Sequence, residues 1–574
     1  MAQATPEETV PPELDNEKAL DQRLQTLQDN KQSWAALPLA EKIAMAKRLL
    51  ENSAKVARRQ VMSAARAKSI PLDSPLVGEE WLGGPTIVIR NLRLLIETLE
   101  ELESSGAPST DDFTIKTTPE GQTIVKVFPA SHWDKLLFTG FTAEVWMEDE
   151  VRPDNLTENM AGFYRDPDPV GKVALVLGAG NVASIGTLDV VYKLFAEGQV
   201  CILKMNPVND YLGPFIEAAF AEFIDRGFVQ MAYGGVDVGA YLCSHDLVEE
   251  IHITGSDRTH DAIVYGVGEE GQARKERDEP RTNKRITSEL GNVSPVIIVP
   301  GKWSDSDLRF HAENLASQIA NNGGFNCNAA RVIITHEGWD QRQDFLGHLR
   351  SVLAEIAPRD AYYPGASERF EKFVQYGDKA ESFGLHDEDH LPWTVLFDID
   401  PEDTSHICFT TEAFCGVKCE TALPASDTAE FLRRAAEFCN ENIWGTLSAS
   451  IIVAPKTAST FSEEVEEAIA TLRYGSIVIN HWPALSYGLG VTTWGAFPGH
   501  TYQDIQSGIG VVHNTHLFDS PQKSVVRGPF RVFPKPAWFV TNKNTHRIGE
   551  QLTRFEENPS FLRFVRVVKE AVKG

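Results

Sequence analysis

The amino-acid sequence predicts an α/β protein with a largely parallel sheet, because apolar strands alternate with helical segments along the chain. One observation is a β-α-β unit, in which the strand and glycine turn VALVLGAGN (173–181) precede a helix and a second strand, QVCILKM (199–205). Another is the pair of further apolar strands, EEIHITGS (249–256) and SPVIIVP (294–300). At 574 residues and 42% hydrophobic composition, the chain exceeds the size of one core, so we expect more than one domain.

Composition excludes several classes of partner. The formal charge of −27, from 54 basic and 81 acidic residues, disfavours nucleic acid and anionic membranes. The N-terminus has no apolar signal region, and no stretch approaches the roughly 18 apolar residues of a membrane span. Seven cysteines without a CxxC pair suit a reducing compartment. We therefore expect a cytoplasmic protein with no membrane span and no nucleic-acid partner.

Cys415 and Cys419 have the spacing of two metal ligands on one helical turn. They lack histidine neighbours at ligand spacing, and we predict no metal site.

Amphipathic helices open the chain. Apolar residues recur at three- and four-residue steps in two segments separated by Pro38. The first segment contains Leu20, Leu24 and Leu27, and the second begins near Ile43. Between 122 and 147 the period changes to two, in QTIVKVF and FTAEVWM, which predicts a β-hairpin outside the main core. Such an arm often pairs subunits, so we expect a homodimer or homotetramer.

Two later segments carry weaker signals. The stretch between Tyr265 and Ile286 is dense in both charge signs and nearly free of apolar residues, which predicts a solvated loop rather than a basic recognition patch. The tail from Arg547 ends in a helical pattern that predicts docking through one apolar face. That face contains Phe561, Phe564, Val565 and Val568.

Cys327 lies in NNGGFNCNAARVIIT (321–335), and its chemistry is the central question. A free cysteine is most often a small buried hydrophobe. Here its neighbours are Asn326 and Asn328, and the preceding Gly323-Gly324 pair allows close backbone approach and exposed N–H groups. These polar surroundings favour a nucleophile over a packed thiol.

The glycine turn after the first strand resembles a dinucleotide fingerprint, in which Gly178 and Gly180 would let the backbone meet a pyrophosphate. That fingerprint requires an acidic residue at the end of the second strand. This strand ends at Lys204 and is followed by Asn206, with no acid. Either the turn is structural, or a cofactor lies differently and Lys204 meets its adenosine half.

Seven motifs decide between these options. In chain order, LGAGN, ILK, ITGS, SELG, NxGxxC, ExF and YGSIVIN resemble the aldehyde dehydrogenase superfamily, over most of residues 15 to 500. SELG and NxGxxC at this separation are the more specific pair. The chain looks like a divergent member with some likeness to acyl-CoA reductases.

The resemblance implies an aldehyde-dehydrogenase-like α/β fold: a Rossmann-type cofactor domain, an α/β catalytic domain and a β-hairpin oligomerisation arm. The cofactor domain is expected at 1–112 and 150–290, and the catalytic domain at 291–500. Bridging or oligomerisation β segments are expected at 113–149 and 520–545, before a helical tail at 546–574.

The same resemblance implies roles for three catalytic residues. Cys327 matches the nucleophile that attacks the aldehyde, and Asn181, with the backbone N–H of Cys327, matches the donors to the resulting oxyanion. Glu289 matches the general base that activates water against the thioester. The residues alone leave structural roles open, with Asn181 as a helix cap and Glu289 in an ion pair.

A nicotinamide cofactor, NAD or NADP, is implied as well. Lys204 resembles the ligand of the adenosine ribose and Glu412 the ligand of the nicotinamide ribose, with Phe414 beside the ring. Thr254, Gly255 and Ser256 would line the pyrophosphate and nicotinamide path. The family often places a glutamate three residues after the lysine, where this chain has Pro207, so NAD and NADP both stay possible.

The expected reaction is oxidation of a small-molecule aldehyde to a carboxylic acid. Two alternatives stay open: a coenzyme A-dependent acylating enzyme or acyl-thioester reductase, and a non-catalytic protein with the same fold. Departures from the family pattern include Gly180 beside Asn181 and Phe325 two residues before Cys327. An aromatic group near the end of the catalytic segment could form the mouth of the site or pack in the core: His481, Trp482, Tyr487 and Trp494.

Overall fold

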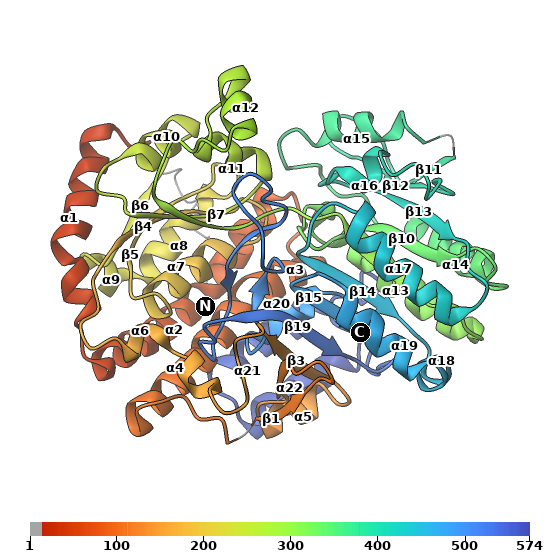
Figure 1. Cartoon of the computed structure of the whole chain (residues 1–574), viewed down its shortest axis with the longest axis horizontal. Coiled ribbons are helices and arrows are strands. Elements are labelled where there is room, and N and C mark those ends of the chain that lie inside the picture. The colour runs from red at the N-terminus through yellow and green to blue at the C-terminus, as the bar shows by residue number, and fades with distance from the viewer. Residues whose placement is uncertain (1–13, 112, 378) are drawn as a thin grey trace, which may run out of the picture.

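The computed structural model describes residues 14–111, 113–377 and 379–574, whose strands form a six-stranded sheet, an eleven-stranded sheet and a two-stranded pair. In Figure 1 the N-terminal helices lie with the six-stranded sheet in one half of the molecule, and the segments between residues 305 and 460 lie in the other half. No helix among the described residues is long and apolar enough to cross a membrane.

The six-stranded sheet confirms the predicted β-α-β unit. Its order is β17-β8-β7-β4-β5-β6, parallel from β8 to β6 and antiparallel at β17. Because parallel strands share one carboxyl edge, the residues that end or follow β4, β5, β7 and β8 converge there. The strands are β4 (Val173–Leu177), β5 (Val200–Lys204), β6 (Val229–Ala232), β7 (Glu250–Thr254), β8 (Arg285–Glu289) and β17 (Gly508–Ile509).

Helices cover this sheet as the apolar periodicity predicts. Helix α7 (Ile185–Phe195) connects β4 to β5, and Gly198 after it has a left-handed φ of 67°, which suits glycine. Helices α1 (Glu17–Ala35) and α2 (Leu39–Ala67) are separated at Pro38, which is the N-cap of α2. The buried leucines of α1 join the same core as the sheet, so the N-terminal helices belong to this half.

The eleven-stranded sheet has the order β1-β2-β3-β19-β15-β14-β9-β10-β13-β12-β11. The run from β19 to β12 is parallel, and the edge strands β1 (Thr114–Thr117) and β11 (Ala380–Phe383) are antiparallel to their neighbours. Its parallel strands are β9 (Ser294–Ile298), β10 (Ala330–His336), β12 (Trp393–Leu396), β13 (Val417–Leu423), β14 (Ser448–Ile452), β15 (Ser476–Ile479) and β19 (Pro521–Arg527). Helices α13 (Asp305–Ala320), α14 (Arg342–Glu355) and α17 (Thr428–Asn442) lie along it in Figure 1.

The predicted hairpin is present, but its position differs from the prediction. Strands β2 (Thr123–Phe128) and β3 (Thr142–Met147) are antiparallel, with α5 (His132–Leu137) in their connection. Strand β19 pairs with β15 on one side and with β3 on the other, so the hairpin continues the large sheet instead of lying outside the core. The expected role of the hairpin in subunit pairing stays a prediction.

The charged segment between 265 and 286 is not simply a loop, which corrects the prediction. It contains helix α12 (Gly268–Glu276) before β8 begins. Glu270 lies in the first turn and pairs with Arg274 at 3.0 Å, and Lys275 lies in the last turn. These charges complement the helix dipole and form an i,i+4 pair, so they stabilise a helix without a buried face.

The C-terminal tail forms helices α21 (Thr545–Glu557) and α22 (Phe561–Ala571). Docking is confirmed for one residue of the predicted face, Phe564, which packs against Trp133 of α5 with ring centroids 5.7 Å apart. Val568 of that face is exposed, whereas Val567, which lies outside it, is buried. Phe561 and Val565 of the same pattern are exposed. Helix α22 therefore buries one stripe and leaves another apolar stripe in solvent.

Candidate active site

Asn181, Glu289 and Cys327 line one pocket of about 390 Å³, which we call the Cys327 pocket. Asn181 follows β4, Glu289 ends β8, and Cys327 lies in the turn that leads into β10. The first two come from the six-stranded sheet and the third from the eleven-stranded sheet. The structure thus brings the three predicted catalytic residues together at the boundary between the sheets.

Cys327 is partly buried, and the turn before it has unusual backbone geometry. Asn322, Gly323 and Gly324 all have positive φ, at 54°, 68° and 81°. A Cβ on Gly324 would lie 3.0 Å from the backbone of Cys415, so this tight turn requires glycine there. Burial raises the pKa of the Cys327 thiol well above its ordinary value, and the neighbouring Glu289 carboxyl raises it further. The resting thiol is therefore protonated and needs a base.

Glu289 can be that base. It is buried at the end of β8, and burial raises its pKa to about 8, with the nearby Asp189 raising it further. The Oε1 atom of Glu289 has no hydrogen-bond partner among the described residues. A buried carboxyl with an unpartnered oxygen beside a thiol points to proton transfer rather than to a structural ion pair.

Asn181 is held in place by the loop before Cys327. Its Nδ2 donates to the Phe325 carbonyl at 2.9 Å, which orients the amide and leaves its second N–H for another acceptor. Its own backbone carbonyl accepts from Nδ2 of Asn322 at 2.9 Å and from Nζ of Lys68 at 3.2 Å. Asn181 therefore links the two halves of the pocket, and no side-chain capping bond marks the start of the following helix α7.

Close packing explains why residue 180 is a glycine. A Cβ there would lie 2.7 Å from Oδ1 of Asn206, which follows β5. Asn209 in the same segment donates to the Ala179 carbonyl at 2.8 Å. The segment after β5 therefore packs closely against the glycine turn. This contact gives the turn a structural role, which was one of the two options for it.

Several residues that contact the site carried no signal in the sequence. Lys68, near the end of α2, donates to Glu80 at 2.8 Å and to Oδ1 of Asn322 at 2.9 Å. Tyr362 donates to the same Asn322 oxygen at 2.9 Å. These residues are far apart in the chain and belong to no motif, so only tertiary structure could identify them.

Three of the four predicted aromatic residues line the pocket. Trp482, Tyr487 and Trp494 do so, and Tyr487 packs edge-on against Trp494 with centroids 5.6 Å apart. His481 instead bonds the Pro529 carbonyl at 2.9 Å from a buried position, and burial lowers its pKa to about 4. His481 is therefore a core residue, so of the two alternatives left open for this aromatic group, packing holds for His481.

The predicted cofactor residues lie partly on the carboxyl edge of the six-stranded sheet. Lys204 ends β5 and is buried, and burial lowers its pKa. Thr254 ends β7 and donates to Asp189 at 2.9 Å, while the Gly255 N–H donates to the Glu289 carbonyl at 3.0 Å. Ser256 caps helix α11 (Asp257–Val264). Because the Thr254 hydroxyl and the Gly255 N–H already donate within the protein, these two residues can offer a ligand close packing rather than a hydrogen bond.

Glu412 and Phe414 come from the other sheet, in the segment before β13. Burial raises the pKa of Glu412 to about 7, and its Oε1 has no hydrogen-bond partner among the described residues. Phe414 adopts a left-handed φ of 41° and packs edge-on against Tyr363 at 5.0 Å. Glu412 thus has the unsatisfied acceptor that a ligand hydroxyl could fill.

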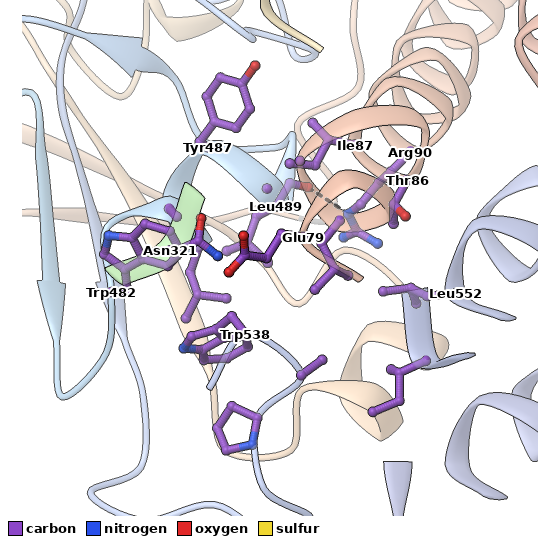
Figure 2. A pocket seen from close by; sticks show the side chains of 18 of the residues that line it. Glu79, Thr86, Ile87, Arg90, Asn321, Trp482, Tyr487, Leu489, Trp538 and Leu552 are labelled. Carbon is purple, nitrogen blue, oxygen red and sulfur yellow. Dashed lines mark hydrogen bonds between the residues drawn. The ribbon is translucent and has the colours of Figure 1, made fainter. Parts of the chain in front are cut away.

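The far wall of the Cys327 pocket comes from parts of the chain that no motif marks. Figure 2 shows Trp482 and Leu552 on opposite sides of the pocket, with Trp538 and Leu489 between them. Residues 532–538 and helices α21 and α22 contribute to this wall. The C-terminal tail therefore shapes the same pocket as the cysteine, which the sequence did not reveal.

Comparison with known proteins finds similarity to aldehyde dehydrogenases. The model of the aldehyde dehydrogenase family matches residues 139–363. The chain is 24% identical to the aldehyde dehydrogenase LUC3 of a Fusarium species, over 37% of this chain and 39% of that one. It is 23% identical to the dimeric NADP-preferring aldehyde dehydrogenase of Mus musculus, over 47% and 57%. The chain thus spans about half the length of the curated relatives it matches.

Solved structures show the same fold over nearly the whole chain. An indole-3-acetaldehyde dehydrogenase in complex with NAD⁺ has a TM-score of 0.58 at 17% identity, covering 89% of this chain and 88% of that one. An NADP-dependent glyceraldehyde-3-phosphate dehydrogenase from Bacillus halodurans, with NADP, has a TM-score of 0.57 at 14% identity, covering 89% and 91%. Residues 139–363 are therefore similar to the aldehyde dehydrogenase family, and nearly the whole chain has the fold of these dehydrogenase structures.

Proposed function

We propose that this protein is an NAD(P)-dependent aldehyde dehydrogenase that oxidises an aldehyde to a carboxylic acid through a thioester on Cys327. The observation that carries the proposal is the shared pocket of Cys327, Glu289 and Asn181, in which a thiol, a carboxyl with a pKa raised to about 8 and an amide face one cavity. A nucleophile, a base and an oxyanion donor are the groups that acyl chemistry on an aldehyde needs.

In the first step, Glu289 accepts the proton of the Cys327 thiol, with which it interacts directly. The thiolate attacks the aldehyde carbon, forms a C–S bond and leaves negative charge on the former carbonyl oxygen. The free N–H of the Asn181 amide and the backbone N–H of Cys327 donate to that oxygen. Because the bond from Asn181 to Phe325 already orients the amide, little reorganisation is needed.

When NAD or NADP is bound, its nicotinamide supplies the acceptor for the hydride that leaves the aldehyde carbon. Lys204 on the edge of the six-stranded sheet and Glu412 from the opposite half are the residues that would hold it. The unpartnered, buried Oε1 of Glu412 fits a hydroxyl donor such as a ribose provides.

Glu289 then releases the thiol's proton to solvent and, in the last step, removes a proton from a water molecule, whose oxygen attacks the thioester carbon. The C–S bond breaks, the carboxylic acid leaves, and the Cys327 thiolate is restored. The buried position of Glu289 makes it a stronger base than an exposed carboxylate once it is ionised, because its raised pKa increases its proton affinity.

The proposal is tested by incubating the purified protein with a panel of aldehydes and either NAD⁺ or NADP⁺, with and without coenzyme A, and identifying the products. We expect reduced cofactor and a free carboxylic acid without coenzyme A. Turnover that requires coenzyme A and yields only acyl-CoA would instead select the acylating reaction. Binding of cofactor without turnover of any aldehyde would select a non-catalytic role.

A further inference from the structure

The Cys327 pocket extends well beyond the reacting groups, and most of its far wall is apolar. Ile87, Leu489, Trp538, Ile548, Leu552 and Val567 all contribute to this wall. Figure 2 shows Ile87 and Leu552 on the side of the pocket opposite Trp482, with Leu489 between them and Trp482. A volume of about 390 Å³ lies within the range of small-molecule pockets, which is roughly 300–1,000 Å³.

The charged residues that line the pocket near Cys327 form ion pairs within the protein. Nζ of Lys68 lies 2.8 Å from Glu80, and both side chains are almost fully buried. Glu79 lies 2.8 Å from Arg359 and also accepts from the Asn322 N–H. Neither pair has a charge left for a ligand.

The charged residues at the far end are paired as well. Arg90 lies 2.9 Å from both Asp134 and Glu556, and it also donates to the Leu489 carbonyl, a bond drawn in Figure 2. The second oxygen of Glu556 pairs with Arg93 at 2.6 Å. Two arginines and two buried carboxylates therefore cancel.

Lys535, the remaining lysine of the pocket lining, lies 2.9 Å from Glu313. Among the described lining residues, Glu289 is then the only ionisable acid or base of the Asp, Glu, Lys or Arg type that has no ion-pair partner. Its pKa of about 8 keeps it largely neutral at pH 7. A charged substrate tail would lose its water here without gaining a partner, which costs several kcal/mol.

The rim of the pocket is apolar too. Leu136, Phe533 and Val568 line the pocket and are also exposed, by 54%, 87% and 37%. Phe561 and Leu562, on the same helix as Val568, are exposed by 68% and 72%. Exposed apolar side chains gathered at the mouth of an apolar pocket favour the entry of an apolar ligand.

We propose that the substrates are electrically neutral aldehydes with an extended apolar chain or ring, which lies between Cys327 and the wall formed by helices α21 and α22. Aldehydes that carry a carboxylate, phosphate or quaternary ammonium at the far end are excluded. This inference rests on the proposed function, because it identifies the substrate class of that site.

The test compares kcat/KM for butanal, hexanal, octanal and decanal with those for 8-oxooctanoate and its trimethylammonium counterpart. We expect kcat/KM to rise roughly fourfold for each added methylene, until the pocket is filled. We expect a terminal charge to lower kcat/KM at least about 100-fold relative to octanal. A flat length series, or equal use of octanal and 8-oxooctanoate, would overturn the inference while leaving the proposed function intact.

A variant provides the reverse experiment. Leu552→Lys adds an unpaired cation to the far wall, and we expect it to shift the ratio of kcat/KM for 8-oxooctanoate over octanal upward by at least about tenfold. Leu552→Met, which adds no charge, should leave this ratio within about twofold of wild type. Equal ratios in both variants would show that the far wall does not contact the substrate tail.

A binding measurement keeps the inference testable even without turnover. Calorimetry with Cys327→Ala protein would compare octanamide with its analogue that carries a terminal carboxylate. We expect octanamide to bind at least about 100-fold more tightly. Equal affinity would refute the inference, whatever the result of the aldehyde panel.

Discussion

The two ends of the Cys327 pocket differ in whether their buried ionisable side chains have a partner of opposite charge. At the catalytic end, Glu289 is buried without an opposite charge, and its pKa is raised to about 8. At the far end, Arg90 is equally buried but lies 2.9 Å from two carboxylates, which together with its other contacts hold its pKa above the ordinary value. Both residues are buried, so the difference between them is that Arg90 has ion-pair partners and Glu289 has none among the described residues.

This difference distinguishes a residue suited to proton transfer from a residue that stabilises the fold. An unpaired buried carboxyl exchanges its proton near neutral pH, which catalysis requires. Arg90, a fully paired buried arginine, keeps its charge and joins α4 (Ile87–Ser105) to α5, to α21 and to the Leu489 carbonyl. Mutations at the catalytic end should therefore affect turnover, and mutations at the far end should affect stability and substrate choice.

The largest expected effect is at the nucleophile. Cys327→Ala removes the thiol that would form the proposed thioester, so we expect kcat to fall at least about 10,000-fold with no loss of folding. Reduced-cofactor production and circular dichroism would be measured together. The matched control is Cys243→Ala, which replaces a partly exposed cysteine on α10 (Val236–Ser244) and should retain activity. Wild-type rates from Cys327→Ala would remove the mechanism.

The next effect concerns the base. Glu289→Gln keeps the size and burial of the side chain but cannot accept a proton, so thioester hydrolysis should slow by about 100- to 10,000-fold. If the thiol can lose its proton to solvent, one equivalent of reduced cofactor per subunit should still appear as a burst before the reaction stalls. Stopped-flow absorbance would measure the burst. Steady-state rates equal to wild type would contradict the assignment of Glu289 as base.

A smaller effect is expected from pH. Glu289 acts as a base only when ionised, and its raised pKa of about 8 means that it is mostly protonated at pH 7. The rate of thioester hydrolysis should therefore rise about tenfold per pH unit below pH 8 and level off above it. Single-turnover kinetics between pH 6 and 9 would measure this. The Glu289→Gln protein should lack the rise, and a wild-type rate that falls with pH would contradict the sign.

The smallest effect on turnover is expected at the far end, where stability should change instead. Glu556→Gln leaves the buried Arg90 with one carboxylate and Arg93 without its buried partner, which should lower the free energy of unfolding by about 3 kcal/mol. Urea denaturation would measure it. The matched control is Glu97→Gln, which removes an exposed partner of Arg93 and should cost less than about 1 kcal/mol. Equal costs would mean that the buried cluster is not structural.

Local sequence predicted most of the secondary structure that surrounds the site. The strand at 173–177 and the helix after it follow from a run of apolar residues, a glycine turn and a change of period, all of which act over a few residues. The charged segment around α12 was predicted wrongly, because charge composition favours solvent exposure but does not forbid a helix whose charges complement its dipole.

The candidate site was predicted in part. Asn181, Glu289 and Cys327 stood in motifs and converge in one pocket, although their chemical roles stay predictions until turnover is measured. The aromatic residues could not be sorted by sequence, since His481 and Trp482 are adjacent and only the second lines the pocket. Which of two neighbouring side chains faces a cavity depends on the packing around both.

The sequence by itself determined the α/β class, the order of its strands along the chain, and a thiol, a carboxyl and an amide in patterns typical of one enzyme superfamily. Only the tertiary structure decided that the C-terminal tail closes the pocket and that Lys68, Arg90 and their partners neutralise its lining. The physical reason is distance along the chain: Arg90 and Glu556 are separated by 466 residues, and no local pattern records a contact that forms only when the core packs.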